Sequence, residues 1–586
     1  MITWRLKRAG VRDDDDGVAL IAVIGIGAVL LLLVTTMLAS SVSGLVKADN
    51  DQDWNAAMSA AYAGVEEYQS KLANDNTYQQ YGSLATSFST GSSYTSTDAN
   101  PAFGIGAGGS WAAVDGSAGR AAYRYEVDNS KYAATGVIRL QATGRVGKIT
   151  RSVVADLKQQ GFIDYLYFTD YEIQDPALSS TSCIPAYGWA VSSRPNCTAI
   201  QFGPTDVIAG PVHSNDVLRI CGSTFKMRVT TAYQPTTGDR YILPSGCSTP
   251  TFAIAKPEFA PVVSMPQTNL LLKQETRSDL TTTGVPRPGC LYTGPTTITF
   301  NAAGTMTVRS PWTRKTNVAG DPATSGTVSA TCGTPGTVAG SLGSSTGQTI
   351  SVPANNLVYV QSVPRTSSDP NYWATGTYPS GFTCASASGS SGTSNGLGYP
   401  TVNEQAPSST SSAPSYGCDK GDVFVKGQVH GALTVASDNY VYVVGDITYV
   451  DKQADILGLV GQNAVWVWNP VDSRSNLLDP ATTGREIDAA ILSVGHTFIV
   501  QNNDDGLKGV LTVYGSIAQK FRGPVGTAMV SGGVTTLVSG YSKAYAYDPR
   551  LRYSAPPKFL SPVSTSYGVT VLVESKTAFN FDGTPR

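Results

Sequence analysis

One uncharged apolar run constrains this chain more than any other feature. Residues 17–39 contain no charged side chain, and the short segment before them carries four basic ones, Arg5, Lys7, Arg8 and Arg12. At about 1.5 Å per residue, a helix over residues 18–39 would be roughly 33 Å long, enough to cross a hydrocarbon core of about 30 Å. Basic residues favour the cytoplasmic side. We therefore predict a single-pass segment with a cytoplasmic N-terminus and an extracellular C-terminus.

Three interpretations of this run compete. A secretory signal peptide would have a shorter apolar core, although residues 39–41 are small enough for a cleavage site. A simple signal anchor fits the length. The third is a prepilin: a leader over residues 1–17 that ends in Gly17, then an apolar helix that continues into an amphipathic one. The residues that follow the run distinguish between these.

Helical periodicity continues beyond the apolar run. Apolar side chains recur at alternating steps of four and three, which marks one stripe of a helix. The stripe consists of Trp54, Met58, Ala61, Val65, Tyr68 and Leu72. We expect a long helix region over residues 18–80, whose first part, 18–39, lies in a membrane or filament core. The second part needs a globular partner. A membrane anchor followed by an unrelated helical spacer is the alternative.

The sequence Ala60-Ala-Tyr-Ala-Gly-Val-Glu-Glu67 resembles the Ala-Glu-Ala-Gly-Leu-Glu stretch of PilX-type minor pilins of type IV pilus systems, and the resemblance covers about the first 75 residues. It implies cleavage between Gly17 and Val18 by a prepilin peptidase. It also implies partnership with other pilins and the pilus assembly machinery. Mature pilins commonly carry an acidic fifth residue, where this chain would have Ala22. That departure favours a minor, capping or priming role over that of a bulk subunit.

The next segments predict a small sheet. Residues 81–120 begin with a stretch rich in Ser, Thr and Gly that has little to bury, and we expect a flexible linker there. Strand patterns follow at 122–127, 136–142 and 150–157, separated by turn residues. Residues 121–163 should therefore form a small antiparallel sheet that covers the stripe, as in the body of a pilin.

All the cysteines lie in the central region, residues 164–419, where short strand patterns alternate with Gly and Pro. They are Cys183, Cys197, Cys221, Cys247, Cys290, Cys332, Cys384 and Cys418. An even number in an extracellular segment indicates disulfides. Connectivity cannot be read from the sequence; sequential pairing is our guess, because each neighbouring pair closes one local loop. We expect this region to be loop-rich, partly disordered and held by its disulfides.

From residue 420 to 586 the pattern predicts a β-helix-like domain. Aliphatic residues occupy odd positions across glycine corners, as at Val423, Val425, Leu433 and Val435. A sandwich of hairpins is the main competitor. The segments 455–460, 515–526 and 540–552 resemble a C-terminal region of poorly characterised surface proteins that also carry pilin-like N-termini. That resemblance brings no known activity.

A basic and aromatic cluster near the C-terminus is a candidate for binding an anionic or saccharide surface. Its members are Lys520, Arg522, Tyr541, Lys543, Tyr545, Tyr547, Arg550 and Arg552. The alternative is that these side chains hold the end of the β domain by hydrogen bonds and stacking. A surface or glycan receptor would be the partner in the first case.

Composition and motifs narrow the function classes. A net charge of −2 gives no reason to expect nucleic acid as a partner. The three histidines are too few for a convincing metal centre, and we find no catalytic motif in context, so we expect no metal, no cofactor and no enzyme activity. The predicted fold is mainly β with one long N-terminal helix, and the predicted function is a minor pilin or pseudopilin. A surface-anchored carbohydrate-active enzyme and an envelope protein without a pilus are the alternatives.

Overall fold

In a computed structural model, the chain is described over residues 16–586 apart from 76–77, 85, 95–97, 105–110, 133–136, 160, 205, 282–285, 386, 392–393, 480–483, 532–533, 553 and 561–566. It divides into two units. Unit 1 is drawn from Met1–Ser130, Ile138–Lys158 and Gly568–Arg586, and unit 2 from Lys131–Val137 and Gln159–Tyr567. The fold is mainly β with one long N-terminal helix, as expected.

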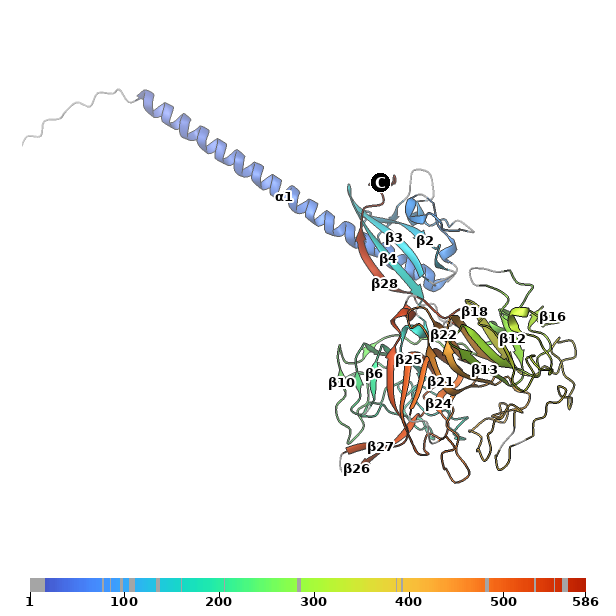
Figure 1. Cartoon of the computed structure of the whole chain (residues 1–586). Coiled ribbons are helices and arrows are strands. Elements are labelled where there is room, and N and C mark those ends of the chain that lie inside the picture. The colour runs from blue at the N-terminus through green and yellow to red at the C-terminus, as the bar shows by residue number, and fades with distance from the viewer. Residues whose placement is uncertain are drawn as a thin grey trace, which may run out of the picture. The chain divides into compact units, whose positions relative to one another are not determined.

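Unit 1 combines the long helix with a five-stranded sheet of order β1-β2-β3-β4-β28. The helix is α1 (Asp16–Asn74), about 88 Å long at 1.5 Å per residue. The strands are β1 (Ala112–Ala113), β2 (Ala121–Asp128), β3 (Val137–Val146), β4 (Ile149–Gln159) and β28 (Tyr567–Ser575). β2 pairs antiparallel with β1 and with β3. The C-terminal half of α1 packs on this sheet, and its N-terminal half projects beyond it (Figure 1).

Unit 2 is inserted between two neighbouring strands of unit 1. β4 ends at Gln159 and β28 begins at Tyr567, yet the two are adjacent in the small sheet. The chain between them forms nearly all of unit 2. This corrects the expected boundary at residue 420, because β28 completes the small sheet of unit 1 instead of belonging to a separate C-terminal domain.

Residues 81–120 are not the flexible linker that we expected, where the structure describes them. They form two 3-10 turns, η2 (Ser87–Ser89) and η3 (Pro101–Phe103), and then β1; a further turn, η1 (Tyr78–Gln80), comes just before them. Phe103 is buried, and Ser89 donates a 2.9 Å hydrogen bond to the buried carboxylate of Glu126 on β2. The Ser- and Thr-rich composition therefore serves capping and side-chain hydrogen bonds to the sheet.

Unit 2 is a coil of mostly parallel strands. One row of parallel neighbours runs β12-β18-β20-β22-β24-β25-β5-β7-β9-β11. A second row runs β13-β19-β21-β24-β25-β27-β6-β8-β10. The strands that contribute are β5 (Tyr167–Tyr171), β6 (Val207–Ala209), β7 (Val212–Ser214), β8 (Thr224–Phe225), β9 (Val229–Thr231), β10 (Thr251–Phe252), β11 (Glu258–Phe259), β12 (Cys290–Thr293), β13 (Thr296–Asn301), β18 (Asn356–Gln361), β19 (Val423–Val429), β20 (Ala432–Ser437), β21 (Val441–Tyr449), β22 (Ile456–Gly461), β24 (Gly484–Val500), β25 (Leu507–Phe521) and β27 (Val534–Tyr547).

The remaining elements decorate this coil. β14 (Thr305–Arg309) pairs antiparallel with β13 and with β17 (Gln348–Ser351), and β26 (Gly526–Ser531) pairs antiparallel with β27. β15 (Asn317–Ala319) and β16 (Ser325–Thr327) form a separate pair, and β23 (Val465–Val467) lies parallel between β21 and β24. Short helical elements are α3 (Leu270–Gln274), η4 (Phe162–Asp164), η5 (Ala330–Cys332) and η6 (Pro549–Arg552).

The order of strands in space differs from their order in the chain. β5, the first strand of unit 2, pairs with β25, which comes some 350 residues later, through Tyr167 opposite Ile517. From β5 the chain builds the coil outward to β11 and then resumes at β12, at the other end of the row. The two halves of the coil therefore meet at its middle, where β25 and β27 contact β5 and β6.

The interior of the coil confirms the odd-position pattern. Val423, Val425, Leu433 and Val435 are fully buried in one aliphatic core that runs through both halves of the unit. The even positions do not all face solvent: Phe424 and Tyr442 stack at 4.8 Å and are buried as well. Loops from the cysteine-containing region cover that outer face.

Residues 164–419 are an integral part of unit 2 and not loosely held loops, over the residues that the structure describes. They supply β5 to β18 of the coil, and Glu404 ties one of their loops to the strands beneath it. Its buried carboxylate accepts hydrogen bonds from Tyr416 (2.7 Å), Trp468 (3.0 Å) and Gln501 (3.1 Å). The expected boundary at residue 419 therefore has no counterpart in the fold.

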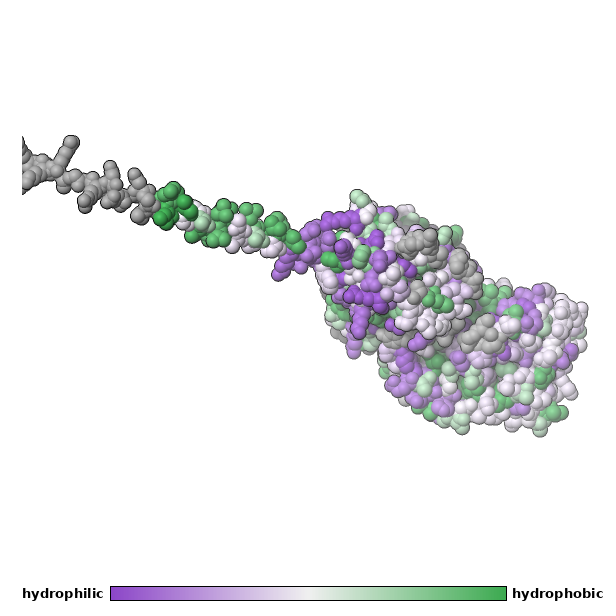
Figure 2. All heavy atoms as spheres, turned by 90° about the horizontal axis from the view of Figure 1, so that it is seen from above, coloured by the Kyte–Doolittle hydropathy of each residue, from purple (hydrophilic) through white to green (hydrophobic). Residues whose placement is uncertain are grey.

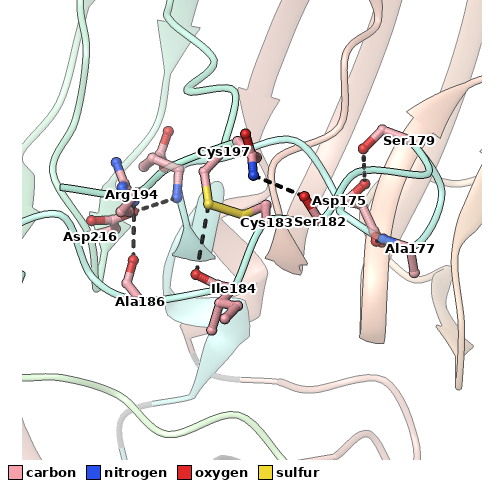
Figure 3. Close-up of a disulfide and its surroundings, with 12 residues drawn as sticks. Asp175, Ala177, Ser179, Ser182, Cys183, Ile184, Ala186, Arg194, Cys197 and Asp216 are labelled. Atoms are coloured by element: carbon pink, nitrogen blue, oxygen red, sulfur yellow. Dashed lines mark hydrogen bonds and ion pairs between the residues drawn. A yellow bond between two sulfur atoms is a disulfide. The ribbon is translucent and has the colours of Figure 1, made fainter.

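The four disulfides pair neighbouring cysteines, as guessed. They are Cys183–Cys197, Cys221–Cys247, Cys290–Cys332 and Cys384–Cys418. Figure 3 shows the first of them beside the ion pair between Arg194 and the buried Asp216. Each bridge closes a local loop next to the coil, which explains why the Gly- and Ser-rich connections can be ordered.

Candidate functional site

The N-terminal half of α1 is an exposed apolar rod. Its large aliphatic side chains are 51–72% exposed from Leu20 to Val46. Figure 2 shows this half as mainly hydrophobic surface, which gives way to hydrophilic surface where the helix approaches the sheet. Over the described residues α1 is long and apolar enough to cross a membrane. It therefore fits a single-pass membrane anchor.

Several polar side chains of the rod form hydrogen bonds within the helix. Thr35 and Thr36 donate hydrogen bonds of 2.9 Å to the carbonyl oxygens of Leu31 and Leu32, four residues earlier. Ser40 bonds the carbonyl oxygen of Met37 in the same way. No polar hydrogen of these groups needs water, so the rod suits an apolar environment of lipid or of other helices.

The expected processing and assembly positions lie at the start of α1. Gly17 and Val18 fall in its first turn. The surroundings of these two residues, and the whole of residues 1–15, lie outside the described part of the chain. Ala22 is exposed. The structure thus places Ala22 on the free surface of the rod.

The C-terminal half of α1 is docked on the sheet through the predicted stripe. Met58, Ala61, Val65, Tyr68 and Leu72 are 0–9% exposed. Trp54, the first member of the stripe, is 50% exposed and was wrongly included in the buried face. Its ring lies 4.6 Å from the guanidinium of Arg151 on β4, which also pairs with Glu574 on β28 at 2.7 Å. Trp54 therefore marks the edge of the helix–sheet contact.

Gly144 determines how closely the helix approaches the sheet. It lies inside β3, not in a turn as its position in the sequence indicated. A Cβ atom at this position would lie 2.0 Å from the carbonyl oxygen of Ala57 and 2.3 Å from the amide nitrogen of Ala61. The backbones of α1 and β3 are thus in contact, which only a glycine opposite small helix residues permits.

A polar network closes the far end of the helix–sheet contact. The Tyr125 hydroxyl on β2 donates to Glu67 of α1 at 2.9 Å, and the Asn100 amide contacts Tyr125 at 2.7 Å and Glu67 at 3.2 Å. Burial, with the Glu67 charge as a second cause, raises the pKa of Tyr125 well above its usual value. Tyr125 therefore remains a donor, and Glu67 of α1 has a defined structural role.

The basic and aromatic cluster does not form an exposed binding surface. Arg522 is fully buried and pairs with Glu172 at 2.7 Å, while Lys543 pairs with Asp206 at 2.6 Å. Arg550 pairs with Asp548 at 2.6 Å. Tyr541, Tyr545 and Tyr547 are 1–7% exposed; Lys520 is half-buried, and the exposed Arg552 lies 6.0 Å from the ring of Tyr547. The surface-binding hypothesis was wrong here, because most of these side chains are buried, and Arg522 and Lys543 join the β25 and β27 segments to those of β5 and β6.

No group of three or more metal-ligating side chains gathers within the described ranges of the chain. His213 is buried, with one ring nitrogen 2.9 Å from the Thr230 hydroxyl and the other 3.1 Å from Asn215. Burial lowers the pKa of His213 to about 4, so its ring stays neutral. His496 pairs instead with the buried Asp175 at 2.7 Å.

Comparison with known proteins adds little. No protein-family model matches the chain, and no curated protein sequence matches it. Among solved structures, the crystal structure of the competence-associated pilin ComZ from Thermus thermophilus matches 89% of this chain and 97% of its own, at 10% identity and a TM-score of 0.22. At that TM-score the likeness carries no argument about this chain.

Proposed function

We propose that this chain is a non-enzymatic minor pilin or pseudopilin of a type IV pilus-like system, anchored in a membrane before assembly. The observation that supports the proposal is the division of α1 into two halves. One half is an apolar rod with no side-chain cover, and the other is buried on an antiparallel sheet. Such a rod can exchange lipid for the helices of other subunits without changing the fold of unit 1.

The insertion of unit 2 supports a minor role. The coil inserted between β4 and β28 is much larger than unit 1. If this chain were the bulk subunit, every position of the filament would have to accommodate that coil. Ala22, exposed on the rod, lacks the acidic group that the resemblance leads us to expect in a bulk subunit. Unit 2 would then be displayed outside the cell for filament priming, capping or adhesion, with the N-terminal side of α1 in the cytoplasm.

Filament preparations test this role against that of an envelope protein without a pilus. Surface filaments are sheared from cells that have, or lack, the pilus assembly ATPase, and the chain is quantified in the filament and membrane fractions. We expect it in the sheared fraction of the first cells and in the membrane fraction of the second. An unchanged distribution between the two strains would favour the envelope protein.

A further inference from the structure

A polar cleft of about 440 Å³ lies in unit 2, outside the clusters described so far. One wall is the turn that leads into the Cys183–Cys197 disulfide, and the other walls come from loops that follow β18 and β24. The residues that line it are Gln174, Asp175, Leu178, Ser179, Ser180, Thr181, Pro407, Ser408, Trp466, Thr497, Ile499, Val500, Asn502, Asn503, Asp504 and Pro524. Its volume is in the range of small-molecule sites.

The first wall is held rigid by Asp175, which is 2% exposed. One carboxylate oxygen accepts hydrogen bonds from the backbone nitrogens of Ala177 (2.9 Å) and Leu178 (3.3 Å), and the other pairs with His496 at 2.7 Å. The Ser179 hydroxyl donates to the Asp175 carbonyl oxygen at 2.6 Å, as Figure 3 shows. Asp175 is therefore fully engaged in shaping the turn and is not a free acid facing the cleft.

The floor of the cleft is apolar and includes one unused hydrogen-bond donor. Leu178, Trp466 and Ile499 belong to one buried cluster. Trp466 is only 2% exposed, and its indole N–H has no hydrogen-bond partner. That nitrogen is sealed beneath the surface, so the floor offers a ligand apolar contact and not a hydrogen bond.

The chemistry of the lining selects the kind of ligand. It includes no Lys, Arg or His, so nothing in it would neutralise a phosphate, sulfate or carboxylate. Hydroxyl and amide groups dominate the rim, through Ser180, Thr181, Ser408, Asn502 and Asn503. Such groups both donate and accept hydrogen bonds, as sugar hydroxyls do, and the apolar floor suits the C–H face of a sugar ring.

We infer that this cleft binds a neutral saccharide unit, whose hydroxyls bond the polar rim and whose ring rests on the apolar floor. The inference deepens the proposed function, because a displayed unit 2 would then contact a glycan, and it rests on that function for its biological setting. The binding itself is a property of unit 2. If the chain binds a saccharide but does not enter filaments, the proposed function fails and the site stands. If it enters filaments but binds no saccharide, the proposed function stands and the site fails.

Calorimetric titration of the purified full chain in detergent tests the site. The probes are maltotriose, cellotriose and chitotriose at millimolar concentration, with a sulfated trisaccharide as the anionic comparison. We expect saturable binding of at least one neutral trisaccharide and weaker binding of the sulfated one. Absence of binding by all three neutral sugars, or preference for the sulfated one, would overturn the inference.

One variant and two controls locate the binding. Ser408 is exposed at the rim, so Ser408→Trp should fill the cleft and abolish binding, whereas Ser409→Trp, on the exposed neighbouring residue outside the lining, should not. Trp466→Phe keeps an aromatic ring in the apolar floor and is a second control, which should leave the affinity nearly unchanged. Unchanged affinity in Ser408→Trp would refute the site.

Discussion

Substitution of Gly144 by alanine tests the contact between α1 and the sheet. The added methyl group would lie 2.0 Å from the Ala57 carbonyl oxygen, where ordinary contacts begin at 3.4 Å. Both near neighbours are backbone atoms of a helix, so no side-chain rotation relieves the clash, and the helix must shift by more than about 1 Å. Overpacking of this kind costs about 1–3 kcal/mol, and we expect the upper end.

Amide hydrogen exchange of the full chain in detergent measures this cost where it acts. A loss of about 3 kcal/mol should speed exchange of the α1 amides between residues 57 and 72 by roughly 100-fold. Gly44→Ala is the control, because Gly44 lies in the same helix with no atom within 4 Å of its would-be Cβ, and it should not speed exchange. Exchange in Gly144→Ala within twofold of the wild type would refute the close approach of the two backbones.

Three further predictions concern unit 2. Arg522→Met leaves the buried Glu172 without its cation and should lower the free energy of unfolding by about 3–5 kcal/mol in urea titrations. Arg228→Met breaks a half-exposed pair with Glu258 and should change that free energy little. An equal effect of the two substitutions would contradict the buried pair. Burial raises the pKa of Asp422 to about 8, against about 3.9 when unfolded, so wild-type stability should fall as pH rises between these values and level off above. Asp422→Asn has no carboxyl group to titrate at this position, so its free energy of unfolding relative to that of the wild type should increase from pH 5 to pH 8.5. A difference between the two proteins that does not change with pH would contradict this prediction. Replacing Cys221 and Cys247 by serine opens a 26-residue loop beside the coil and should cost about 2–4 kcal/mol by the same titration; no loss would show that the loop is held without its bridge.

The parts of the fold that repeat locally could be predicted from the sequence. The spacing of Met58 to Leu72 specifies one helix face, and the odd-position aliphatic residues from Val423 specify one interior, because side-chain direction follows helix and strand periods. The disulfide guess succeeded for a similar reason, since each pair closes a short loop. Trp54 fits the helix period equally well, but exposure at the end of a stripe depends on where the partner sheet stops.

Contacts between distant segments could not be predicted. Nothing in β5 indicates that Tyr167 pairs beside Ile517, because a parallel register between short strands leaves no local pattern. The basic and aromatic cluster was misinterpreted for the same reason. Glu172, the partner of Arg522, and Asp206, the partner of Lys543, lie more than 300 residues away in the sequence. The cleft at Trp466 was missed because it combines a turn, two loops and an unpaired donor, none of which has a sequence signature.

Mass spectrometry of the N-terminus of the chain, purified from cells that carry a prepilin peptidase, tests the central proposal most directly. If α1 is a pilin assembly helix, cleavage after Gly17 should leave Val18 as the first residue, followed by the uncharged run that forms the exposed rod. An intact Met1, or a start at Val42 after signal-peptide cleavage, would contradict the proposal.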